Sequence, residues 1–500
     1  MRSPYPSAAK LESLLSSKKE AYWQGRGERM ALSLFREMGK RVPAYKKFLA
    51  ANNIDSSRIK KWEDLTVVPP IDKNNYLCRY PLHELCWDGD LAGGQYNISA
   101  TSGSTGEPFY FPRTEEQDEQ YALLAELYLR TNFSVHKRKT LYINAFPMGI
   151  WIGGLFTYAT IRKIAERTGY PLSIVNPGIH KEEILKIVKK LGGEFEQILI
   201  GGYGPFVKDI IDDGIRDGIN WKGFRLGFIF SAEGFTEDFR DYVVRKTGVD
   251  PAFGTLNHYG TVDLGTMSYE TPFAIAVRRI ALRNKMLKRS LFGQEGKVPT
   301  LTQFIPELFF FEERGGDLFC SARSGLPLFR YDLKDRGNVY TMKELLEKGD
   351  KLSLSLFDET KKKGVPKKTI WNLPFVQVFE RSDFSVSFFA FQIYPEVIRR
   401  ALDGLENDFL TGKFSLQSTF SKKGRPELII HVELRPHAHA GVLLAKKIRT
   451  CIIAQLLKES SEYRETFKEK GVAIFPSIHL LPYEDLRYFK PGTKQKWTIK

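Results

Sequence analysis

The sequence predicts an α/β protein with a large amino-terminal domain of mostly parallel sheets with flanking helices, followed by a small carboxy-terminal α+β domain. Three observations lead to this prediction. Short apolar runs alternate with helix-like stretches from about residue 140 to residue 250, and strand-like runs follow one another directly after about residue 300. A separate strand and helix pattern begins near Phe384, and the chain of 500 residues is long enough for two hydrophobic cores.

Local patterns define the elements expected in the large domain, residues 1–380. Residues 1–75 should be helical, because segments such as "ERMALSLFREMGKRVPAYKKFLAANN" repeat apolar residues at helical spacing. The expected parallel strands are "KTLYINAF", "PLSIV", "QILIGGY" and "FRLGFIFSA", and "KEEILKIVKKLG" and "GPFVKDIIDDGIRDG" are expected helices between them. Residues 340–370 are polar and rich in lysine, which indicates an exposed excursion.

The small domain, residues 384–500, mixes strands and helices within a short stretch. After a first strand, the expected order is the helix "YPEVIRRALDGL", the strands "KFSLQSTFS" and "ELIIHVEL", the helix "GVLLAKKIRTCIIAQLLKES" and a final strand. This order predicts a compact α+β unit.

Composition places the chain among ordinary globular proteins, with 42% hydrophobic and 27% charged residues. Cys78, Cys86, Cys320 and Cys451 lack the spacing of metal ligands, so we expect reduced thiols rather than a zinc site. The amino terminus has no apolar core typical of a secretory signal. Together these features predict a cytoplasmic protein.

One uncharged segment, residues 141–161, has about the length that spans a bilayer. It contains Asn144, Pro147 and three glycines, and no second segment of this kind accompanies it. We therefore expect a buried strand, a turn and the start of a helix, and no membrane span.

The formal net charge of +16 is compatible with nucleic acid, an anionic membrane surface, or acidic ligands and partners. Basic residues are dispersed, apart from the run at residues 361–368, and no zinc-finger, helix-turn-helix or RNA-binding signature accompanies them. Nucleic acid is therefore not an expected partner.

The stretch "TSGSTGEP", residues 101–108, follows the strand-like "GQYNISA". Its glycines permit left-handed backbone, so that successive N–H groups can line an anion site, and its hydroxyl groups add donors. The spacing GxxxxGK[ST] of the Walker loop is absent. On these residues alone the stretch is either a phosphate-binding loop or a flexible connection.

Further segments of the chain, together with this loop, resemble the motifs of a known family. The chain resembles the adenylate-forming superfamily, and in particular its phenylacetate–CoA ligase and CapK-like branch, from about residue 30 to the end. The segments that carry the resemblance are "FREMGKRVPAYKKFL", "VPPIDKNNYLCRYPLHEL", "TSGSTGEP", "FPMGIWIGGL", "SAEGFTEDFR", "HYGTVDLG", "PLFRYDLKDRG", "ERSDF" and "PGTKQKW". They stand in the order that the family shows.

The resemblance implies a nucleotide site for ATP. The phosphate loop would cradle the β- and γ-phosphates, and the segment at residues 231–240 would lie against adenine, with Tyr259 stacked nearby. Asp335 would hold the ribose hydroxyls in preference to Asp332, because Arg330 and Tyr331 set the register of the family's RY...D stretch. The implied ATP-binding residues are Thr101, Ser102, Gly103, Ser104, Thr105, Gly106, Ala232, Glu233, Tyr259, Gly260, Thr261, Asp335 and Arg381.

The resemblance also implies residues for the metal, the acid and the reaction. Asp263 stands where the family usually has Glu and would face Mg²⁺ (magnesium). An acyl pocket would include Phe146, Gly149 and Gly153, whose apolar and aromatic surroundings favour an aryl or acyl carboxylic acid. Alignment of "GTK" with the family's EGK selects Lys494, rather than Lys496, as the catalytic lysine, and Asp383 would be the hinge.

The implied activity is that of an AMP-forming acid–thiol ligase. A carboxylate attacks the α-phosphorus of ATP, and the acyl group of the resulting acyl-adenylate passes to an acceptor, with CoA as the default. Three departures from the family pattern, Lys334, Glu380 and Ala390, bear mainly on that second step. An acidic carrier protein, which would suit the net charge of +16, an amine or hydroxyl acceptor, and a non-catalytic nucleotide-binding protein of the same fold remain alternatives.

Overall fold

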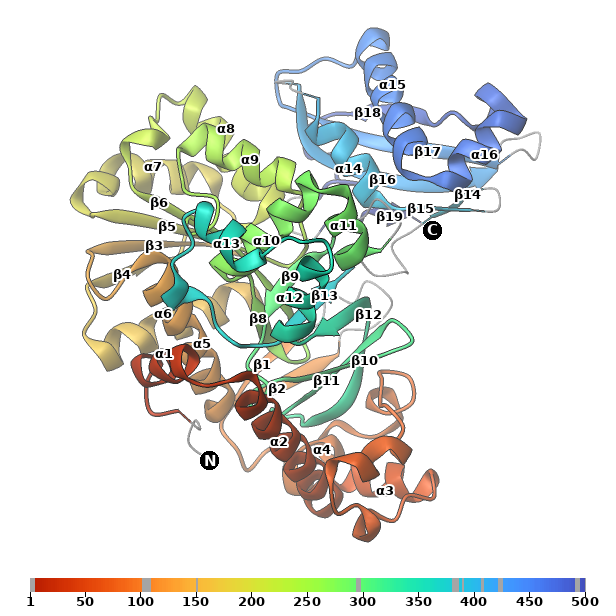
Figure 1. Ribbon diagram of the computed structural model, residues 1–500. Helices are drawn as coiled ribbons and strands as arrows, with labels where there is room; N and C mark the ends of the chain where they lie inside the picture. Colours follow the sequence, from red (N-terminus) through yellow and green to blue (C-terminus); the bar gives the residue numbers. More distant parts are fainter. Residues whose placement is uncertain are drawn as a thin grey trace.

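The computed structural model describes residues 5–100, 109–149, 152–293, 298–379, 386–388, 391–405, 409–420, 426–490 and 495–499 (Figure 1). The amino-terminal segment is α-helical, as predicted, only as far as Ala51, and the rest of the expected helical region, to residue 75, consists of loops and short 3-10 helices. The α-helices are α1 (Ala8–Ser17), α2 (Glu20–Arg41), α3 (Pro43–Ala51) and the short α4 (Leu82–Leu85). One side of α2 is buried because Trp23, Ala31, Leu34, Phe35 and Met38 recur at helical spacing.

A large sheet forms the centre of the molecule. Its strands are β3 (Thr140–Ala145), β4 (Leu172–Val175), β5 (Gln197–Tyr203), β6 (Leu226–Ser231), β7 (Thr255–Thr261), β8 (Gly265–Tyr269), β9 (Thr300–Gln303), β10 (Phe310–Arg314), β11 (Asp317–Ala322), β12 (Leu328–Tyr340) and β13 (Phe375–Val378). Among the described residues their order is β10-β11-β12-β13-β9-β8-β7-β6-β5-β3-β4. Neighbours are parallel from β4 to β7 and antiparallel from β7 to β10.

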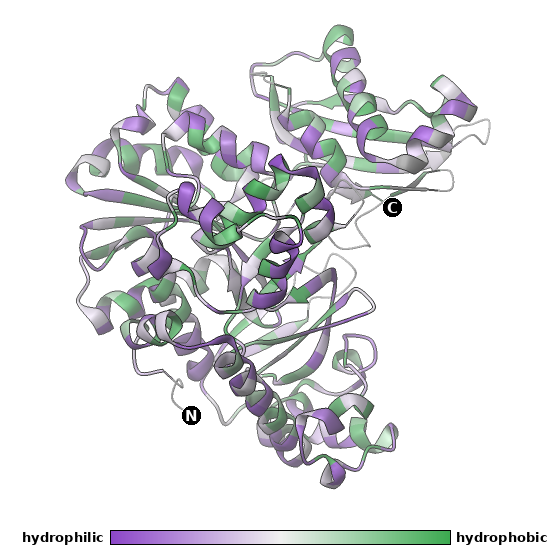
Figure 2. Ribbon diagram, in the orientation of Figure 1, coloured by the Kyte–Doolittle hydropathy of each residue, from purple (hydrophilic) through white to green (hydrophobic). Residues whose placement is uncertain are grey.

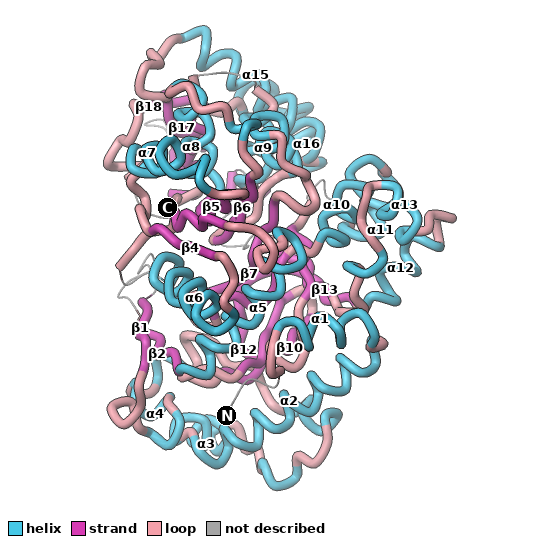
Figure 3. Tube along the Cα trace, turned by 90° about the vertical axis from the view of Figure 1, so that its left-hand side faces the viewer, coloured by secondary structure: helices cyan, strands magenta, loops and turns pink. Residues whose placement is uncertain are grey.

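Helices cover both faces of the parallel part of the sheet. They are α5 (Glu115–Phe133), α6 (Ile152–Thr168), α7 (Lys181–Leu191), α8 (Gly204–Arg216) and α9 (Glu237–Thr247). Figure 3 shows α7, α8 and α9 on one face of β4–β6, and α5 and α6 on the other. Figure 2 shows hydrophobic and hydrophilic segments alternating along the outer helices, as expected where one side faces a sheet and the other faces solvent. Helix α5 differs, because every residue from Gln120 to Leu129 is buried. The α/β prediction is thus confirmed.

The segment expected as an exposed excursion, residues 340–370, packs more closely than its lysine content indicated. It contains α12 (Met342–Asp350) and α13 (Leu356–Lys362), which lie against α10 (Pro272–Arg283) and α11 (Lys285–Phe292). Leu345, Leu356 and Val365 are buried in the hydrophobic cluster that these helices share. The lysines lie on the outer side, so composition alone concealed the apolar positions.

The residues after Val386 have a hydrophobic cluster of their own, and we call residues 386–499 the carboxy-terminal unit. The unit contains β14 (Val386–Phe388), β15 (Phe391–Ile393), α14 (Pro395–Asp403), β16 (Leu410–Phe420), β17 (Pro426–Leu434), α15 (Val442–Glu459), α16 (Ser461–Lys470), β18 (Ser477–Leu481) and β19 (Thr498–Ile499). Its sheet has the order β18-β17-β16-β19, and Figure 1 shows α15 and α16 beside it. The expected boundary at residues 380–384 lies outside the described residues, so the division into two domains stays a prediction.

Residues 141–161, which have about the length of a membrane span, form the end of β3 and the first part of α6 on either side of residues 150–151. Across the described part of the chain, no helix is both long enough and apolar enough to cross a bilayer.

Candidate active site

The residues singled out from the sequence gather at the carboxyl ends of the parallel strands. Phe146 follows β3, Ala232 and Glu233 follow β6, and Tyr259 lies near the end of β7. In open α/β sheets this edge is where ligands bind, because the loops that follow the strands meet there.

Two hydrogen bonds connect β7 with β12 crosswise. The hydroxyl of Tyr259 on β7 donates to Oδ2 of Asp335 on β12 at 2.6 Å. In return, the hydroxyl of Tyr331 on β12 donates to Oδ2 of Asp263, just after β7, at 2.7 Å. Both aspartates are buried, with 8% of each residue exposed. Two segments more than 60 residues apart in the sequence, "HYGTVDLG" and "RYDLKD", therefore form one site.

The turn between β7 and β8 explains the small residues of its motif. A Cβ atom on Gly260 would lie 2.5 Å from the carbonyl oxygen of Gly265, which is too close for any other residue. The hydroxyl of Thr261 accepts a hydrogen bond from the backbone N–H of Leu264 at 3.2 Å. Both residues thus shape the turn that presents Asp263.

His258, in the same motif, is buried against Tyr128, with the ring centroids 4.8 Å apart. Burial lowers the pKa of His258 to about 3, so its imidazole is neutral at pH 7. A buried neutral ring of this kind contributes to packing and has no charge to offer a substrate.

A lysine from the amino-terminal segment also reaches the site. Nζ of Lys73 lies 3.9 Å from Oδ1 of Asp263. Ile71 forms a parallel bridge with Tyr331, which aligns the segment "PPIDKNN" along β12. Lys73 could not be identified from the sequence, because a single lysine in a polar segment carries no signal of its own.

Lys334, one of the departures from the family pattern, has left-handed backbone with φ of 59°. Its ammonium group lies 2.7 Å from both Asp72 and Asp332. These ion pairs help to offset the cost of about 1–2 kcal/mol of left-handed backbone in a residue with a side chain. Asp332 is thereby engaged with a lysine at the surface, whereas Asp335 faces Tyr259.

A buried group of charges lies behind the loop that follows β6. Arg240 donates to Glu237 at 2.9 Å and to Glu270 at 2.7 Å, and Arg278 donates to Glu237 at 2.9 Å. All four residues are at most 6% exposed, and their charges sum to zero. Burial raises the pKa of the Glu237 carboxyl, but Arg240 and Arg278 lower it more, so the net shift is downward.

This ion cluster holds the backbone of the loop at residues 232–236. Arg278 donates to the carbonyl oxygen of Phe235 at 2.6 Å, and Glu270 accepts from the N–H of Asn257 at 3.1 Å. The Asn257 side chain in turn donates to the carbonyl oxygen of Glu233 at 3.0 Å. Ala232 has φ of 81°, an uncommon value for a residue with a side chain, so this loop is held in a specific shape.

The residues expected around an acyl group lie at the end of β3. Phe146 is buried, and a Cβ atom on Gly153 would lie 3.3 Å from the Cβ atom of Phe146. Gly149 has φ of 98° and open space where a Cβ would project. The structure brings these residues together, and their role in binding a substrate stays a prediction.

Several predicted residues lie outside the described part of the chain. They are Thr101, Ser102, Gly103, Ser104, Thr105, Gly106, Arg381, Asp383 and Lys494. The residues next to the phosphate loop are defined: β1 (Tyr96–Ala100) pairs with β2 (Tyr110–Thr114) in antiparallel fashion, and Ala100 faces Tyr110. The expected strand before the loop is therefore present.

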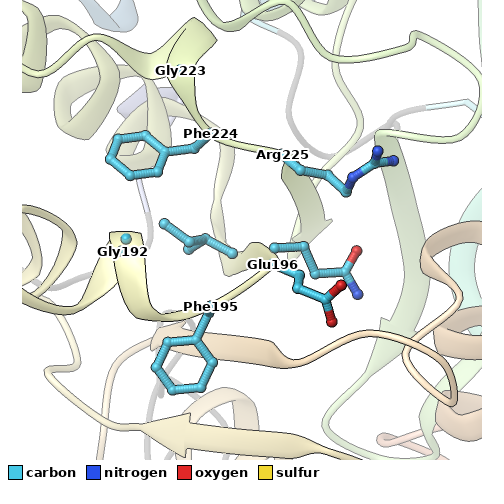
Figure 4. Close-up of a pocket in the computed structure, with 9 residues that line it drawn as sticks. Gly192, Phe195, Glu196, Gly223, Phe224 and Arg225 are labelled. Carbon is cyan, nitrogen blue, oxygen red and sulfur yellow. The ribbon is translucent and has the colours of Figure 1, made fainter.

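A separate pocket of about 190 Å³ opens at the other edge of the sheet (Figure 4). It is lined by Phe195, Glu196, Phe224 and Arg225, close to where β5 and β6 begin. The predicted site residues lie at the carboxyl ends of these strands, so this pocket is no part of the candidate site.

Comparisons with known proteins give a fold but no sequence relative. No protein-family model matches the chain, and no curated protein matches it. Among solved structures, 2-hydroxyisobutyryl-CoA ligase in the postadenylation state, in complex with R3-HIB-AMP, aligns with 100% of this chain and 94% of its own. The sequence identity is 13% and the TM-score is 0.67. The chain therefore has the same fold as this CoA ligase.

Two further structures of that ligase show other states. In the thioesterification state with 2-HIB-AMP and CoA, the TM-score is 0.54 at 12% identity, with 100% of this chain and 94% of the ligase covered. An open conformation with the same ligands gives 0.51 at 12% identity, with 99% and 92% covered. Of the three structures, the one in the postadenylation state is most similar to this chain.

We expect the buried ion cluster to be essential for stability. Glu270→Gln should lower the free energy of unfolding by about 3–5 kcal/mol, because it leaves Arg240 and Arg278 with an uncompensated buried charge. Equilibrium urea unfolding followed by circular dichroism measures this loss. Glu166→Gln is the control: Glu166 pairs with Arg162 on the exposed side of α6, and loss of this pair should cost about 1 kcal/mol or less. Equal losses would contradict the importance assigned to the cluster.

Proposed function

We propose that this protein uses ATP to activate a carboxylic acid as an acyl-adenylate and then transfers the acyl group to a thiol, with CoA as the first candidate. The observation that carries the proposal is the crossed pairing of Tyr259 with Asp335 and of Tyr331 with Asp263. It joins two segments whose implied roles are nucleotide and metal binding, at the sheet edge where ligands bind. The fold shared with a CoA ligase supports the same proposal.

Within this site, Asp335 would accept hydrogen bonds from the ribose hydroxyls, and the Tyr259 hydroxyl would hold its carboxylate in place. The half-buried ring of Tyr259 would lie beside adenine, together with the loop at residues 232–236. Thr101, Ser102, Gly103, Ser104, Thr105 and Gly106 would hold the β- and γ-phosphates, and Arg381 would reach the ribose or the α-phosphate.

Asp263 would be the protein ligand of Mg²⁺. Among the described residues no group of three or more His, Cys, Asp or Glu could hold a metal by itself. A single buried carboxylate nevertheless fits this ion, since Mg²⁺ beside nucleotides usually takes one or two carboxylates plus phosphate oxygens and water. When bound, the ion would neutralise charge on the phosphates, and Lys73 would add a positive charge nearby.

The first step needs no general base, because a carboxylic acid is already ionised at pH 7. Its oxygen attacks the α-phosphorus, the bond to pyrophosphate breaks, and the acyl-adenylate forms. Positioning and charge stabilisation provide most of the acceleration in such reactions. In the second step a thiolate attacks the acyl carbon and AMP leaves.

The acid and the acceptor are the least determined parts of the proposal. Phe146, Gly149 and Gly153 favour an aryl or acyl acid, in line with the resemblance to the phenylacetate–CoA ligase branch. CoA is bound in the ligase of similar fold, which supports it as acceptor. An acidic carrier protein, or an amine or hydroxyl, is the alternative, and a non-catalytic nucleotide-binding protein is the second.

The direct test is pyrophosphate–ATP exchange with a panel of aryl, aliphatic and hydroxy acids. We expect exchange that depends on one class of acid, followed by AMP release on addition of CoA. Exchange without any response to CoA would favour another acceptor. A protein that binds ATP but shows no exchange with any acid would be the non-catalytic alternative.

The two aspartates near the end of β12 provide a second test. Asp335→Ala should weaken the binding of ATP and AMP alike by about tenfold or more, because both nucleotides carry the same ribose and hydrogen bonds to a charged group are strong. Isothermal titration calorimetry measures both affinities. Asp332→Ala, which removes a partner of Lys334 at the surface, should change them little. A reversed order would contradict the proposed ribose site.

The lysines near the carboxyl terminus provide a third test. Lys494→Ala should slow acyl-adenylate formation about 100-fold or more while ATP binding persists, because a lost charge at the reacting phosphate raises only the barrier. Single-turnover measurements separate the two effects. Lys496→Ala, the same change two residues away at an exposed position, is the control. A severe effect from Lys496→Ala alone would shift the assignment by two residues, and equal mild effects would exclude both lysines.

A further inference from the structure

The carboxy-terminal unit contacts the loop at residues 232–236 through Arg399, Trp497 and Asp403, of which Asp403 accepts a hydrogen bond from the hydroxyl of Thr236 at 2.9 Å. The indole N–H of Trp497 donates to Oε2 of Glu233 at 2.8 Å. The guanidinium of Arg399 lies 4.3 Å from the centre of the Trp497 ring and donates to the carbonyl oxygen of Gly234 at 2.8 Å. Its Nη2 atom lies 3.7 Å from Oε2 of Glu233. We call Glu233, Arg399 and Trp497 the loop clamp.

Both sides of the loop clamp are attached to well-packed elements. Trp497 is buried, its ring lies 4.8 Å from that of Phe414, and its carbonyl oxygen accepts from the N–H of Leu416 on β16 at 2.8 Å. Arg399 belongs to α14. Glu233 belongs to the loop that the buried ion cluster holds from behind through Asn257. The loop clamp therefore connects two rigid bodies of structure rather than two unattached loops.

A second group of contacts joins the carboxy-terminal unit to helix α8. Lys413 on β16 lies 3.3 Å from Asp209 on α8, and Arg435 pairs with Asp212 on the same helix. These contacts follow the flank of α8 and do not involve the loop at residues 232–236. The loop clamp and the hydrogen bond from Thr236 to Asp403 thus touch the segment to which the proposed function assigns the nucleotide, whereas the contacts along α8 do not.

We propose that Glu233, Arg399 and Trp497 are positioning residues that hold the carboxy-terminal unit against the nucleotide loop during adenylation and separate before the acyl group is transferred. The proposal rests on the proposed function. The segment that begins at Gln495 is fixed on β16, since the Gln495 carboxamide donates to the carbonyl oxygen of Phe414 at 3.0 Å, and Trp497 of the same segment reaches the loop. The greater similarity to the postadenylation state of the ligase than to its thioesterification state, 0.67 against 0.54, supports the same view.

The test begins with Trp497→Phe, which keeps an aromatic ring between Arg399 and Phe414 and removes the N–H donor to Glu233. We expect the adenylation half-reaction to slow about tenfold, as for loss of a hydrogen bond to a charged group. Release of AMP from a preformed acyl-adenylate on addition of CoA should stay within about twofold of the wild-type rate, because the contact is absent in that step. A variant that merely misfolds would slow both half-reactions, so equal slowing would overturn the proposal.

A double-mutant cycle shows whether the effect passes through the contact with Glu233. Glu233→Ala combined with Trp497→Phe should slow adenylation little more than the stronger of the two single changes, because both remove one interaction. Arg435→Gln is the matched control at the α8 side of the interface, and its effect should multiply with that of Trp497→Phe. Full additivity between the changes at Glu233 and Trp497 would overturn the loop clamp.

Amide hydrogen exchange tests the loop clamp without turnover. Trp497→Phe should speed the exchange of α14, residues 395–403, in the presence of saturating ATP, because the tie between α14 and the loop is weakened. Unchanged exchange in α14 would overturn the loop clamp, regardless of the rates of the two half-reactions. Absence of pyrophosphate exchange with every acid in the wild-type protein would instead overturn the proposed function, so the two failures are distinguishable.

Discussion

The candidate site depends on the buried charges of Arg240, Glu237, Glu270 and Arg278. Ion pairs without water gain little net stability, and well-packed apolar residues would often serve the core as well. Here these charges orient the backbone. Arg278 holds the Phe235 carbonyl oxygen and Glu270 holds the backbone N–H of Asn257, so the loop after β6 has one shape. The contacts that this loop makes with the carboxy-terminal unit, through Glu233 and the Gly234 carbonyl, depend on that constraint.

On the other side of the candidate site, the crossed tyrosine–aspartate pairs hold Asp263 and Asp335 in place in a similar way. A carboxylate buried without partners is costly, and each phenol supplies a donor that leaves the second oxygen to other groups. Because each pair joins β7 to β12, a displacement of either strand would disturb both aspartates at once. Asp263 and Asp335 are in this way held at a fixed separation, as a site for one extended ligand such as a nucleotide requires.

Much of this arrangement could be predicted from the sequence. The apolar periodicity predicts β3 to β6, α7 and α8, and the motif order points to Tyr259, Asp263 and Asp335, which hydrogen bonds of the structure connect to one site. Periodicity could not locate the packing of residues 340–370, whose few buried positions are hidden among lysines. Nor could it find Glu270, Arg278, Lys73 or Trp497, because a buried ion pair or a contact between distant segments depends on tertiary structure and leaves no local pattern.

The contacts described between the carboxy-terminal unit and the rest of the chain are polar, which suits the separation that we propose. These ion pairs and hydrogen bonds can be replaced by water when the parts move apart. An apolar interface would instead expose a hydrophobic patch prone to aggregation. Asp403 lies at this interface and has a raised pKa. Burial raises the pKa of Asp403 from 3.8 to about 6, although the hydrogen bond that it accepts from Thr236 at 2.9 Å lowers it in part. If separation exposes Asp403 to water and returns its pKa to the ordinary 3.8, the docked state binds the proton more tightly, so docking weakens as the pH rises from about 4 to 6 and is constant above. At neutral pH the interface thus contains a charge that favours release, and the loop clamp and the pairs along α8 oppose it.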